Sequence, residues 1–463
     1  MFSQETYIDR RNKLRKKFKS GLLLFLGNTE APMNYPGNTY KYRQDSNFLY
    51  FFGIDHPGLA AVMDIEAGTD CIYGDDYTMD DIIWMGPQPT ISDMAKPIGV
   101  HSVHPLKDLA NTINIALKHG RRIHFLPPYR SNNILQLSNL MGIHPNFIKN
   151  YTSVNFIKAV VSLRSIKDEQ EIAEIEKACS IGYQMHVAAM KMAKPGIYER
   201  EIAGHIEGIA LSHGSSVSFP IILSQNGETL HNHYHGNKLV EGRLMVTDAG
   251  AETDMHYASD FTRTIPVGGK FSTKQKEIYD IVLATNNRAL EIAKPGITYQ
   301  SVHLEASRVI AQGLKDLGIM KGNVEEAVRN GAHALFLPHG LGHMMGLDVH
   351  DMEDLGENYV GYDDEVSRID QFGTAYLRLG RRLEPGFVIT DEPGIYFIPA
   401  LIDQWKSEKI NASFINYDKL EEYRSFGGIR IEDDLLITDK GARLLGKKRI
   451  PATTEEIENT MKS

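Results

Sequence analysis

The stretch Ala193-Lys-Pro-Gly-Ile197 is repeated one hundred residues later as Ala293-Lys-Pro-Gly-Ile297. Each copy lies between two stretches with helical spacing. The downstream stretches carry apolar residues at this spacing: Ile202, Ile206 and Ile209 in the first copy, and Val302, Ala306 and Val309 in the second. Pro and Gly commonly end helices, so the five letters alone could be a shared stop signal. The matching flanks favour a duplicated α/β unit, which predicts a pseudo-two-fold domain with a cleft between its halves.

The chain ahead of this repeat has a different pattern. Apolar runs bounded by turn residues predict buried strands at 22–26, 47–52 and 59–63, and residues 108–118 have helical spacing. We therefore expect a small, self-contained N-terminal α/β domain. No catalytic constellation is visible within it.

A domain boundary is predicted near Val161. Ser165 followed by Asp168 resembles an N-cap with an acid in the first turn, and the helical period then runs from Ile166 to Met192. The two expected domains are residues 1–160 and residues 161–463.

Composition excludes several classes of protein. A chain of 463 residues with 42% hydrophobic and 24% charged residues is typical of a globular protein with two or three domains. Its net charge of −9 disfavours nucleic acid as a partner. Its two cysteines, Cys71 and Cys179, cannot form a disulfide framework and offer no CxxC zinc site. The early apolar run Leu22–Leu26 is too short for a membrane helix or a signal peptide, so a cytoplasmic protein without membrane contact is expected.

Acids end two apolar runs in the second domain. Leu244-Met-Val-Thr-Asp248-Ala-Gly250 is followed by Asp260-Phe-Thr-Arg-Thr264, and a hairpin of the two would hold Asp248 beside Asp260. Two adjacent carboxylates repel each other unless a proton or a cation intervenes. A divalent metal ion is the simplest such cation.

Histidines and glycines alternate in Pro338-His339-Gly-Leu-Gly-His343, which is followed by Asp348-Val-His350-Asp351. The two intervening glycines disfavour a helix, and the glutamate of an HExxH zinc helix is absent. Glycines at these positions fit a close approach of the backbone to a ligand or metal.

Two further runs carry acids, Val388-Ile-Thr-Asp391-Glu392-Pro-Gly394 and Gly428-Ile-Arg430-Ile-Glu432-Asp433-Asp434. Each run alone has an ordinary explanation, and Asp433 and Asp434 are expected to face solvent or to act as caps. The first half of the duplicated domain contributes two acids, and its second half contributes one His and two Glu. Together they supply four carboxylates and one imidazole. That set suits two hard divalent ions about 3.5–4 Å apart. Its oxygen-rich chemistry favours Mn²⁺ over a thiolate zinc site.

These runs resemble the metallopeptidases of the pita-bread fold, in the proline-specific branch that contains aminopeptidase P and prolidase. The motifs TDAG, SDFTRT, PHGLGH, DEPG and GIRIEDD occur in the family's order and with nearly its spacing. The segment Tyr42–Gly53 (YRQDSNFLYFFG) resembles the family's N-terminal domain. The resemblance implies an α/β (α+β) fold in which a small N-terminal α/β domain precedes a pseudo-two-fold pita-bread catalytic domain.

The resemblance also implies residue roles. Asp248 would be a terminal ligand of one metal, Asp260 and Glu432 would bridge both metals, and His343 and Glu392 would complete the second. Substrate-binding or supporting roles fall to His231, His339, His350 and Arg430. The family's LHY segment is Leu230-His231-Asn-His233-Tyr234 here, and register favours His231 over His233. Asp391 stands where the family has an apolar residue; it either adds negative charge near the site or faces solvent.

By resemblance, the expected activity is removal of the N-terminal residue from peptides with proline in second position. A hydroxide held by two divalent ions would attack, Glu392 would carry the proton to the proline nitrogen, and His339 and His350 would steady the oxyanion or the substrate. Cleavage of Xaa-Pro dipeptides is the alternative. A methionine aminopeptidase is disfavoured by the large N-terminal domain, and a metal-free binding protein or a creatinase-like hydrolase by the complete ligand set. A homo-oligomer, dimer or tetramer, is expected of the family.

Overall fold

The computed structural model of the protein describes residues 1–462 and divides the chain into two compact units. The N-terminal unit comprises Met1–Arg164 together with the short segment Glu353–Tyr359. The catalytic unit comprises Ser165–Met352 and the chain from Val360 onward. The sequence did not predict that Glu353–Tyr359 groups with the N-terminal unit.

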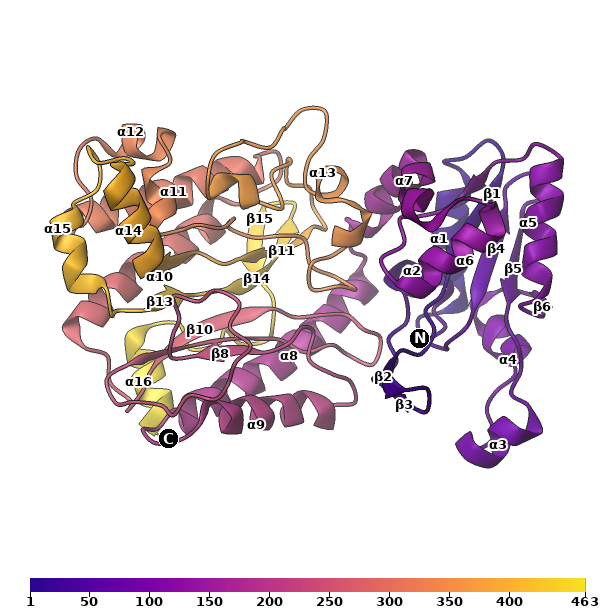
Figure 1. Cartoon of the computed structure of the whole chain (residues 1–463), viewed down its shortest axis with the longest axis horizontal. Coiled ribbons are helices and arrows are strands. Elements are labelled where there is room, and N and C mark those ends of the chain that lie inside the picture. Colours follow the sequence, from indigo (N-terminus) through magenta and orange to yellow (C-terminus); the bar gives the residue numbers. More distant parts are fainter. Residues whose placement is uncertain (463) are drawn as a thin grey trace. The chain divides into compact units, whose positions relative to one another are not determined.

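The N-terminal unit is built around a five-stranded mixed sheet (Figure 1). Its strand order is β6 (Ser102–His104), β5 (Thr69–Tyr73), β4 (Ala60–Asp64), β1 (Leu22–Leu26) and β7 (Ile123–His124). The predicted strands at 22–26 and 59–63 are confirmed as β1 and β4. The helices are α1 (Gln4–Arg15), α2 (Ser46–Phe52), α3 (Met79–Met85), α4 (Ile91–Ala95), α5 (Asp108–Lys118), α6 (Ser131–Met141) and α7 (Val154–Arg164), and β2 (Pro32–Tyr35) pairs with β3 (Asn38–Thr39).

The strand predicted at 47–52 is wrong, because these residues form helix α2. The Asp45 side chain accepts a hydrogen bond from the backbone N–H of Phe48 and so caps the helix. Gly53 ends it at φ +62°, a conformation that glycine adopts without strain. All seven helical residues are buried, so the run has no amphipathic period to distinguish it from a buried strand.

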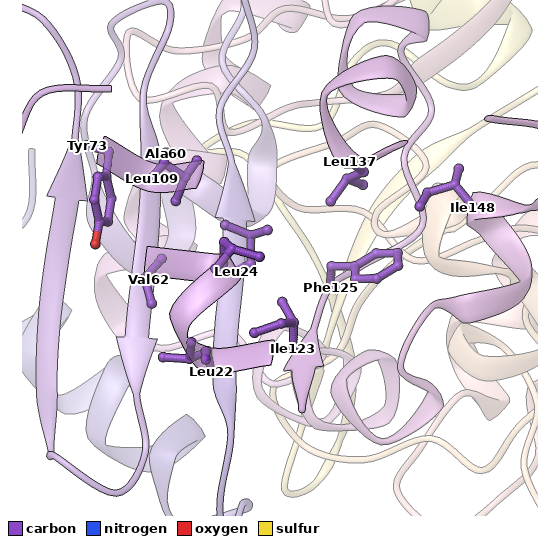
Figure 2. Close-up of a cluster of buried hydrophobic side chains, with 12 residues drawn as sticks. Leu22, Leu24, Ala60, Val62, Tyr73, Leu109, Ile123, Phe125, Leu137 and Ile148 are labelled. Atoms are coloured by element: carbon purple, nitrogen blue, oxygen red, sulfur yellow. The ribbon is translucent and has the colours of Figure 1, made fainter. Parts of the chain in front are cut away.

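An apolar cluster fills one face of this sheet (Figure 2). Leu24 lies opposite Val62 in the antiparallel pair β1–β4, and both side chains point into the cluster beside Ile123. Leu109 of α5 and Leu137 of α6 cover them. This face of the sheet is therefore covered by aliphatic and aromatic side chains.

The catalytic unit repeats one arrangement around its two AKPGI copies. The first copy joins α8 (Glu169–Met192) to α9 (Glu199–Ser212), and the second joins α10 (Thr273–Ile292) to α11 (Tyr299–Asp316). Gly196 and Gly296, at φ +91° and +88°, each donate a backbone hydrogen bond of 2.9 Å, to Leu239 and Leu383 respectively. Those two leucines return equivalent bonds of 2.8 Å to Ile197 and Ile297. The pseudo-two-fold arrangement predicted from the repeat is confirmed.

Helix α8 begins later than the sequence predicted. Its N-cap is Asp168 rather than Ser165, and a capping box with Glu171 completes the first turn. Lys167, the residue before this N-cap, makes its contacts outside the helix. Its backbone N–H donates to the Gly386 carbonyl, and its ammonium group lies 2.9 Å from Asp351. These contacts keep the chain out of the helix until Glu169.

Short sheets carry the strand ends that matter for function. The first half contains β8 (Ile222–Ser224), β9 (Leu244–Ala249) and β10 (Phe261–Pro266), and the second contains β11 (Val388–Asp391) with β14 (Asp433–Thr438) and β15 (Gly441–Leu444), and β12 (Gly394–Tyr396) with β13 (Gly428–Arg430). The predicted hairpin is confirmed as β9–β10, with Asp248 opposite Thr262. An isolated bridge between Thr262 and Glu432 joins the two halves.

Helices flank these strands within the catalytic unit (Figure 1). Helices α8 and α9 contact the strands of the first half, and α10 contacts those of the second. The remaining helices of this unit are α12 (Val324–Arg329), α14 (Pro399–Glu408), α15 (Tyr417–Leu420) and α16 (Thr454–Lys462), whereas α13 (Glu357–Val360) lies almost wholly in the segment grouped with the N-terminal unit. Across residues 1–462, no helix combines the length and apolar character needed to cross a membrane. Cys71 and Cys179 are both free thiols.

Candidate metal centre

Three predicted ligands converge where the two halves meet. Asp260 directly precedes β10, Glu432 follows β13, and His343 lies in the irregular stretch between α12 and α13. Each offers one ligand atom, and these atoms all lie within 4.8 Å of one another. The His343 Nε2 is 3.4 Å from Asp260 Oδ2, and all three side chains are buried.

Backbone pairing holds the loop of His343 against β11. The backbone N–H of Thr390 donates to the His343 carbonyl at 3.0 Å, and that of Glu392 donates to Leu341 at 2.8 Å. A Cβ at Gly342 would lie 2.2 Å from the Thr390 carbonyl oxygen, so only glycine fits this approach. The same pairing brings Glu392 Oε1 to 3.9 Å from His343 Nε2.

Asp248 acts on this cluster through its negative charge. Its Oδ2 accepts a 2.7 Å hydrogen bond from Arg430, whereas its Oδ1 is buried and has no hydrogen-bond partner among residues 1–462. Its charge contributes to the raised pKa of both Asp260 and Glu432. The one remaining carboxylate oxygen of Asp248 is therefore available to a cation.

The carboxylates of this cluster are difficult to ionise together. Burial raises the pKa of Asp260 well above its usual value, and repulsion from Glu432 and Asp248 adds to the shift. Burial also raises the pKa of Glu432, with Glu392 as the next contributor. For Glu392, burial raises the pKa to about 7. A positive charge among these groups would relieve both the burial penalty and the repulsion.

His343 is poised as a ligand rather than as a cation. Burial, followed by the charge of His350, lowers its pKa well below the usual value, so the imidazole is neutral. Its Nδ1 lies 2.9 Å from the Met344 carbonyl, which places the proton on Nδ1. The Nε2 lone pair then faces Asp260 and Glu392, as in histidines that bind a metal through Nε2.

The donor set therefore fits divalent metal ions. It supplies carboxylate oxygens and one neutral imidazole, and Asp248 Oδ1 and Asp260 Oδ1 are both buried with no hydrogen-bond partner in the described part of the chain. Buried carboxylate oxygens of this kind are normally satisfied by hydrogen bonds, cations or protons. Hard divalent ions prefer such oxygen ligands, and imidazole suits several of them.

A hydrogen-bonded chain supports the ligands from one side. The Arg430 guanidinium donates to the Tyr396 hydroxyl at 2.8 Å and to the Thr262 hydroxyl at 3.1 Å. Thr262 donates in turn to Glu432 Oε2 at 2.7 Å. The Tyr396 hydroxyl lies 2.9 Å from His339 Nε2, while His339 Nδ1 lies 2.7 Å from the Gly340 carbonyl. His339 is thus neutral, with the proton on Nδ1, and burial lowers its pKa to about 3.

The other two predicted histidines lie near the ligands. The ring of His350 is centred 4.1 Å from that of His343. His231 is more open to solvent, and its pKa is lowered by partial burial and by the nearby charge of Arg430, with smaller effects from Arg378 and His350. The structure thus brings His231 within electrostatic range of Arg430 and Asp248.

Three acids of these motifs are buried, contrary to what was expected for Asp433 and Asp434. Asp433 pairs with Arg263 at 2.6 Å and with Arg449 at 2.8 Å. Asp434 accepts a 3.0 Å bond from the backbone N–H of Asp260 and so orients that ligand. Asp391 is fully buried rather than facing solvent, and burial raises its pKa well above the usual value.

Three further side chains act at the site but were missed from the sequence. Thr262 could have been found, because it lies two residues after Asp260 on the same strand face. Tyr396 lies in a short strand after the DEPG turn and had no distinguishing signal. Arg378 lies in an irregular stretch, yet its charge lowers the pKa of Glu392 and His343.

Comparison with known families agrees with this geometry. The model of metallopeptidase family M24 matches residues 173–439, and that of the aminopeptidase P N-terminal domain matches residues 7–124. The chain belongs to metallopeptidase family M24. It is thus a hydrolase with the pita-bread catalytic fold predicted from its motifs, and members of this family use divalent metal ions.

Individual relatives of this M24 metallopeptidase match over nearly their whole length. The human Xaa-Pro dipeptidase is 31% identical, over 97% of this chain and 91% of its own. A probable Xaa-Pro aminopeptidase of Paracoccidioides brasiliensis is 33% identical, over 95% and 92%. Among solved structures, aminopeptidase P from Escherichia coli with the inhibitor Pro-Leu has 29% identity and a TM-score of 0.81, covering 99% of this chain and 98% of its own.

Proposed function

We propose that this M24 metallopeptidase removes the N-terminal residue from peptides with proline in second position. The observation that carries the proposal is the buried cluster of Asp260, His343 and Glu432, with Asp248 and Glu392 beside it, on a fold shared with aminopeptidase P. The similarity to Xaa-Pro aminopeptidases and Xaa-Pro dipeptidases supports proline specificity.

Proline at the cleaved bond gives a reason for a dedicated enzyme. Its nitrogen carries no N–H, so a peptidase that relies on a backbone hydrogen bond from this residue binds such substrates poorly. A site that activates the carbonyl before proline through metal ions and charged side chains does not depend on that donor.

The proposed ligands divide between two divalent ions, which we assign as Mn²⁺. Asp248 would hold one ion, Asp260 and Glu432 would contact both, and His343 and Glu392 would complete the second. When bound, such ions polarise a carbonyl oxygen and lower the pKa of water towards neutrality, which supplies a nucleophile. The choice of Mn²⁺ rests on the oxygen-rich donor set.

The remaining roles follow from the hydrogen bonds. Glu392, whose pKa is raised to about 7, would take the proton from the attacking water and pass it to the departing proline nitrogen. His231 and His350 would contact the substrate. Arg430 orients Asp248 directly and Glu432 through Thr262. His339 would donate to the oxyanion only after its Nδ1 leaves the Gly340 carbonyl, so its role begins as one of positioning.

Cleavage of Xaa-Pro dipeptides remains the second candidate, because the human Xaa-Pro dipeptidase matches 97% of this chain. The deciding experiment compares Ala-Pro with Ala-Pro-Ala on Mn²⁺-loaded enzyme and follows release of free alanine. Faster cleavage of the tripeptide supports the aminopeptidase. Cleavage confined to the dipeptide supports the dipeptidase, and no cleavage of either by metal-loaded protein contradicts the proposal.

Three further properties belong to the same proposal. We infer a peptide-specific enzyme that acts in the cytoplasm, where its two free thiols would stay reduced. We infer a homo-oligomer, dimer or tetramer, testable by light scattering. The proposed domains are residues 1–160 and 161–463, and limited proteolysis between them is the test.

A further inference from the structure

Asn286 of α10 is a buried polar side chain that the proposed chemistry does not use. It is 1% exposed, and both ends of its amide make hydrogen bonds. The Nδ2 donates to the Asp391 carbonyl at 3.0 Å, and the Oδ1 accepts a 2.6 Å bond from the Arg449 guanidinium. Arg449 in turn pairs with Asp433 at 2.8 Å. The amide of Asn286 thus connects the end of β11 with the start of β14.

The ends of this connection adjoin two proposed metal ligands. Asp391 directly precedes Glu392, and Asp433 directly follows Glu432. The ladder of β11 and β14 ends at the pair Asp391–Asp433, and the ladder of β12 and β13 begins only beyond the glutamates. The backbone N–H groups of both glutamates donate to other segments of the chain. Strand pairing is thus interrupted where Glu392 and Glu432 lie, and Asn286 braces the last pair before that interruption.

The first half of the repeat places a buried donor at the equivalent position. His186 of α8 lies one hundred residues before Asn286, the same offset as between the two AKPGI copies. It is fully buried, and its Nε2 lies 3.0 Å from the carbonyl of Ala249, the residue after the proposed ligand Asp248. A carbonyl only accepts, so this nitrogen carries the proton. Both helices therefore hold a carbonyl next to a proposed ligand, which supports a role toward the ligands rather than one confined to α10.

We propose that Asn286 is a positioning residue for the metal centre, and that its amide fixes the separation of the segments that carry Glu392 and Glu432. It would act through the two aspartates that adjoin these ligands, not by contact with an ion. The inference rests on the proposed function, which assigns both glutamates as ligands. Groups that orient metal ligands typically change metal affinity by about 10–100-fold when they are replaced.

Asn286→Asp is the most direct test, because it removes the donor and keeps the shape of the side chain. An oxygen without a hydrogen then faces the Asp391 carbonyl, while Oδ1 can still accept from Arg449. The added negative charge would by itself attract Mn²⁺, so a weaker affinity points to lost positioning. The dissociation constant for Mn²⁺, measured by isothermal titration calorimetry on the full chain, should rise about tenfold.

Asn287→Asp is the matched control. Asn287 is the next residue of α10, is exposed, and also accepts a bond from Arg449, at 3.1 Å. The same substitution there adds the same charge beside the same guanidinium, and it leaves the bond from Asn286 to Asp391 in place. Its Mn²⁺ affinity should match that of the wild type.

Arg449→Gln breaks the connection from its partly exposed end, and it decides the question if Asn286→Asp does not fold. Loss of a positive charge would by itself favour Mn²⁺, so weaker binding again points to positioning. If the two residues act through one connection, the double variant should lose less affinity than the product of the two single losses. Urea denaturation of each metal-free variant shows whether stability alone has changed.

The outcomes separate this inference from the proposed function. Equal Mn²⁺ affinity in Asn286→Asp and Asn287→Asp, or a fall in metal-free stability alone, overturns the positioning role and leaves the peptidase standing. A wild type that binds Mn²⁺ but cleaves neither Ala-Pro nor Ala-Pro-Ala contradicts the proposed function, and the affinities then still decide the role of Asn286. Weaker binding in Asn286→Asp and Arg449→Gln, with Asn287→Asp unchanged, supports it.

Discussion

The two units differ in what they bury. The core of the N-terminal unit is aliphatic and aromatic, and buried Arg11 is paired with Asp70 at 2.8 Å. The centre of the catalytic unit instead gathers buried acids, including Asp248, Asp260 and Glu432, and Arg430 pairs with Asp248 there. Apolar burial stabilises a fold outright, whereas clustered carboxylates destabilise it until a cation binds. The metal-free catalytic unit thus contains repulsion among its buried acids, and a bound metal ion would relieve that repulsion.

The largest expected effect is on activity, at the acid that joins the two halves. Glu432→Gln keeps the side-chain shape but removes a charge, and kcat/KM should fall more than about a hundredfold, the upper range for groups that merely support a metal ligand. Metal-free stability should not fall, because a neutral amide replaces a carboxyl group whose ionisation is disfavoured by burial and by Glu392. Peptidase assays and urea denaturation without metal provide both measurements. The exposed Asp439→Asn is the matched control, and full turnover by Glu432→Gln would disprove a ligand role.

A similar change in the other core should affect stability and not chemistry. Leu24→Ala removes a fully buried side chain from the centre of the N-terminal sheet, which typically costs about 2–5 kcal/mol. Far-UV circular dichroism should show an earlier transition in urea. Fluorescence separates the units, since Trp405 of the catalytic unit is buried while the other tryptophan, Trp84, is 80% exposed. A shift of the Trp405 transition as large as the overall shift would show that the units unfold together.

Metal binding should stabilise the catalytic unit alone. At a Mn²⁺ concentration one hundred times the dissociation constant, the free energy of unfolding should rise by about 2.7 kcal/mol. The Trp405 transition in urea should move to higher concentration with Mn²⁺ and return with a chelator. Glu432→Gln should lose most of this shift, and Asp439→Asn should keep it. An equal shift in Glu432→Gln would place the ion elsewhere.

The sequence revealed the parts of the site that local patterns encode. The TDAG and SDFTRT runs predicted the β9–β10 hairpin, because strand ends and alternation are local features. The glycines of HGLGH predicted a close approach of the backbone to a ligand or metal, and the structure shows Gly342 close to the Thr390 carbonyl of β11 instead. The AKPGI repeat predicted the two related halves, since each copy ends one helix and starts the next.

Other features depend on contacts that no local pattern records. Residues 47–52 are buried on every side, so their run fits a strand as well as helix α2. Asp433 was expected at the surface, but Arg263 and Arg449 from distant segments neutralise it in the core. Arg378 follows no motif and reaches the site only through the irregular chain before β11. Tertiary contacts between distant segments, rather than local patterns, decide these positions.

The smallest expected effect concerns two other polar groups buried in the catalytic unit. His303 of α11 and His333 are fully buried, their rings are 6.3 Å apart, and within residues 1–462 none of their ring nitrogens has a hydrogen-bond partner. Burial lowers the pKa of His303 to about 4 and that of His333 to about 3. Both are therefore neutral when folded, whereas the unfolded chain takes up protons below about pH 6.5.

Stability from each histidine is therefore complete above pH 6.5 and is lost as the pH falls from there towards 4. Between pH 7 and pH 5 the expected loss is about 2 kcal/mol per histidine, because the unfolded state alone binds the proton. His303→Leu should remove that share of the pH dependence, whatever its effect on stability at pH 7. The measurement is the free energy of unfolding of metal-free protein at pH 7 and pH 5, followed by Trp405 fluorescence. His101→Leu, at an exposed position of the N-terminal unit, should leave the difference between the two pH values unchanged. If His303→Leu also leaves it unchanged, the buried imidazole is not neutral, and the contrast between the two cores is weaker than the structure indicates.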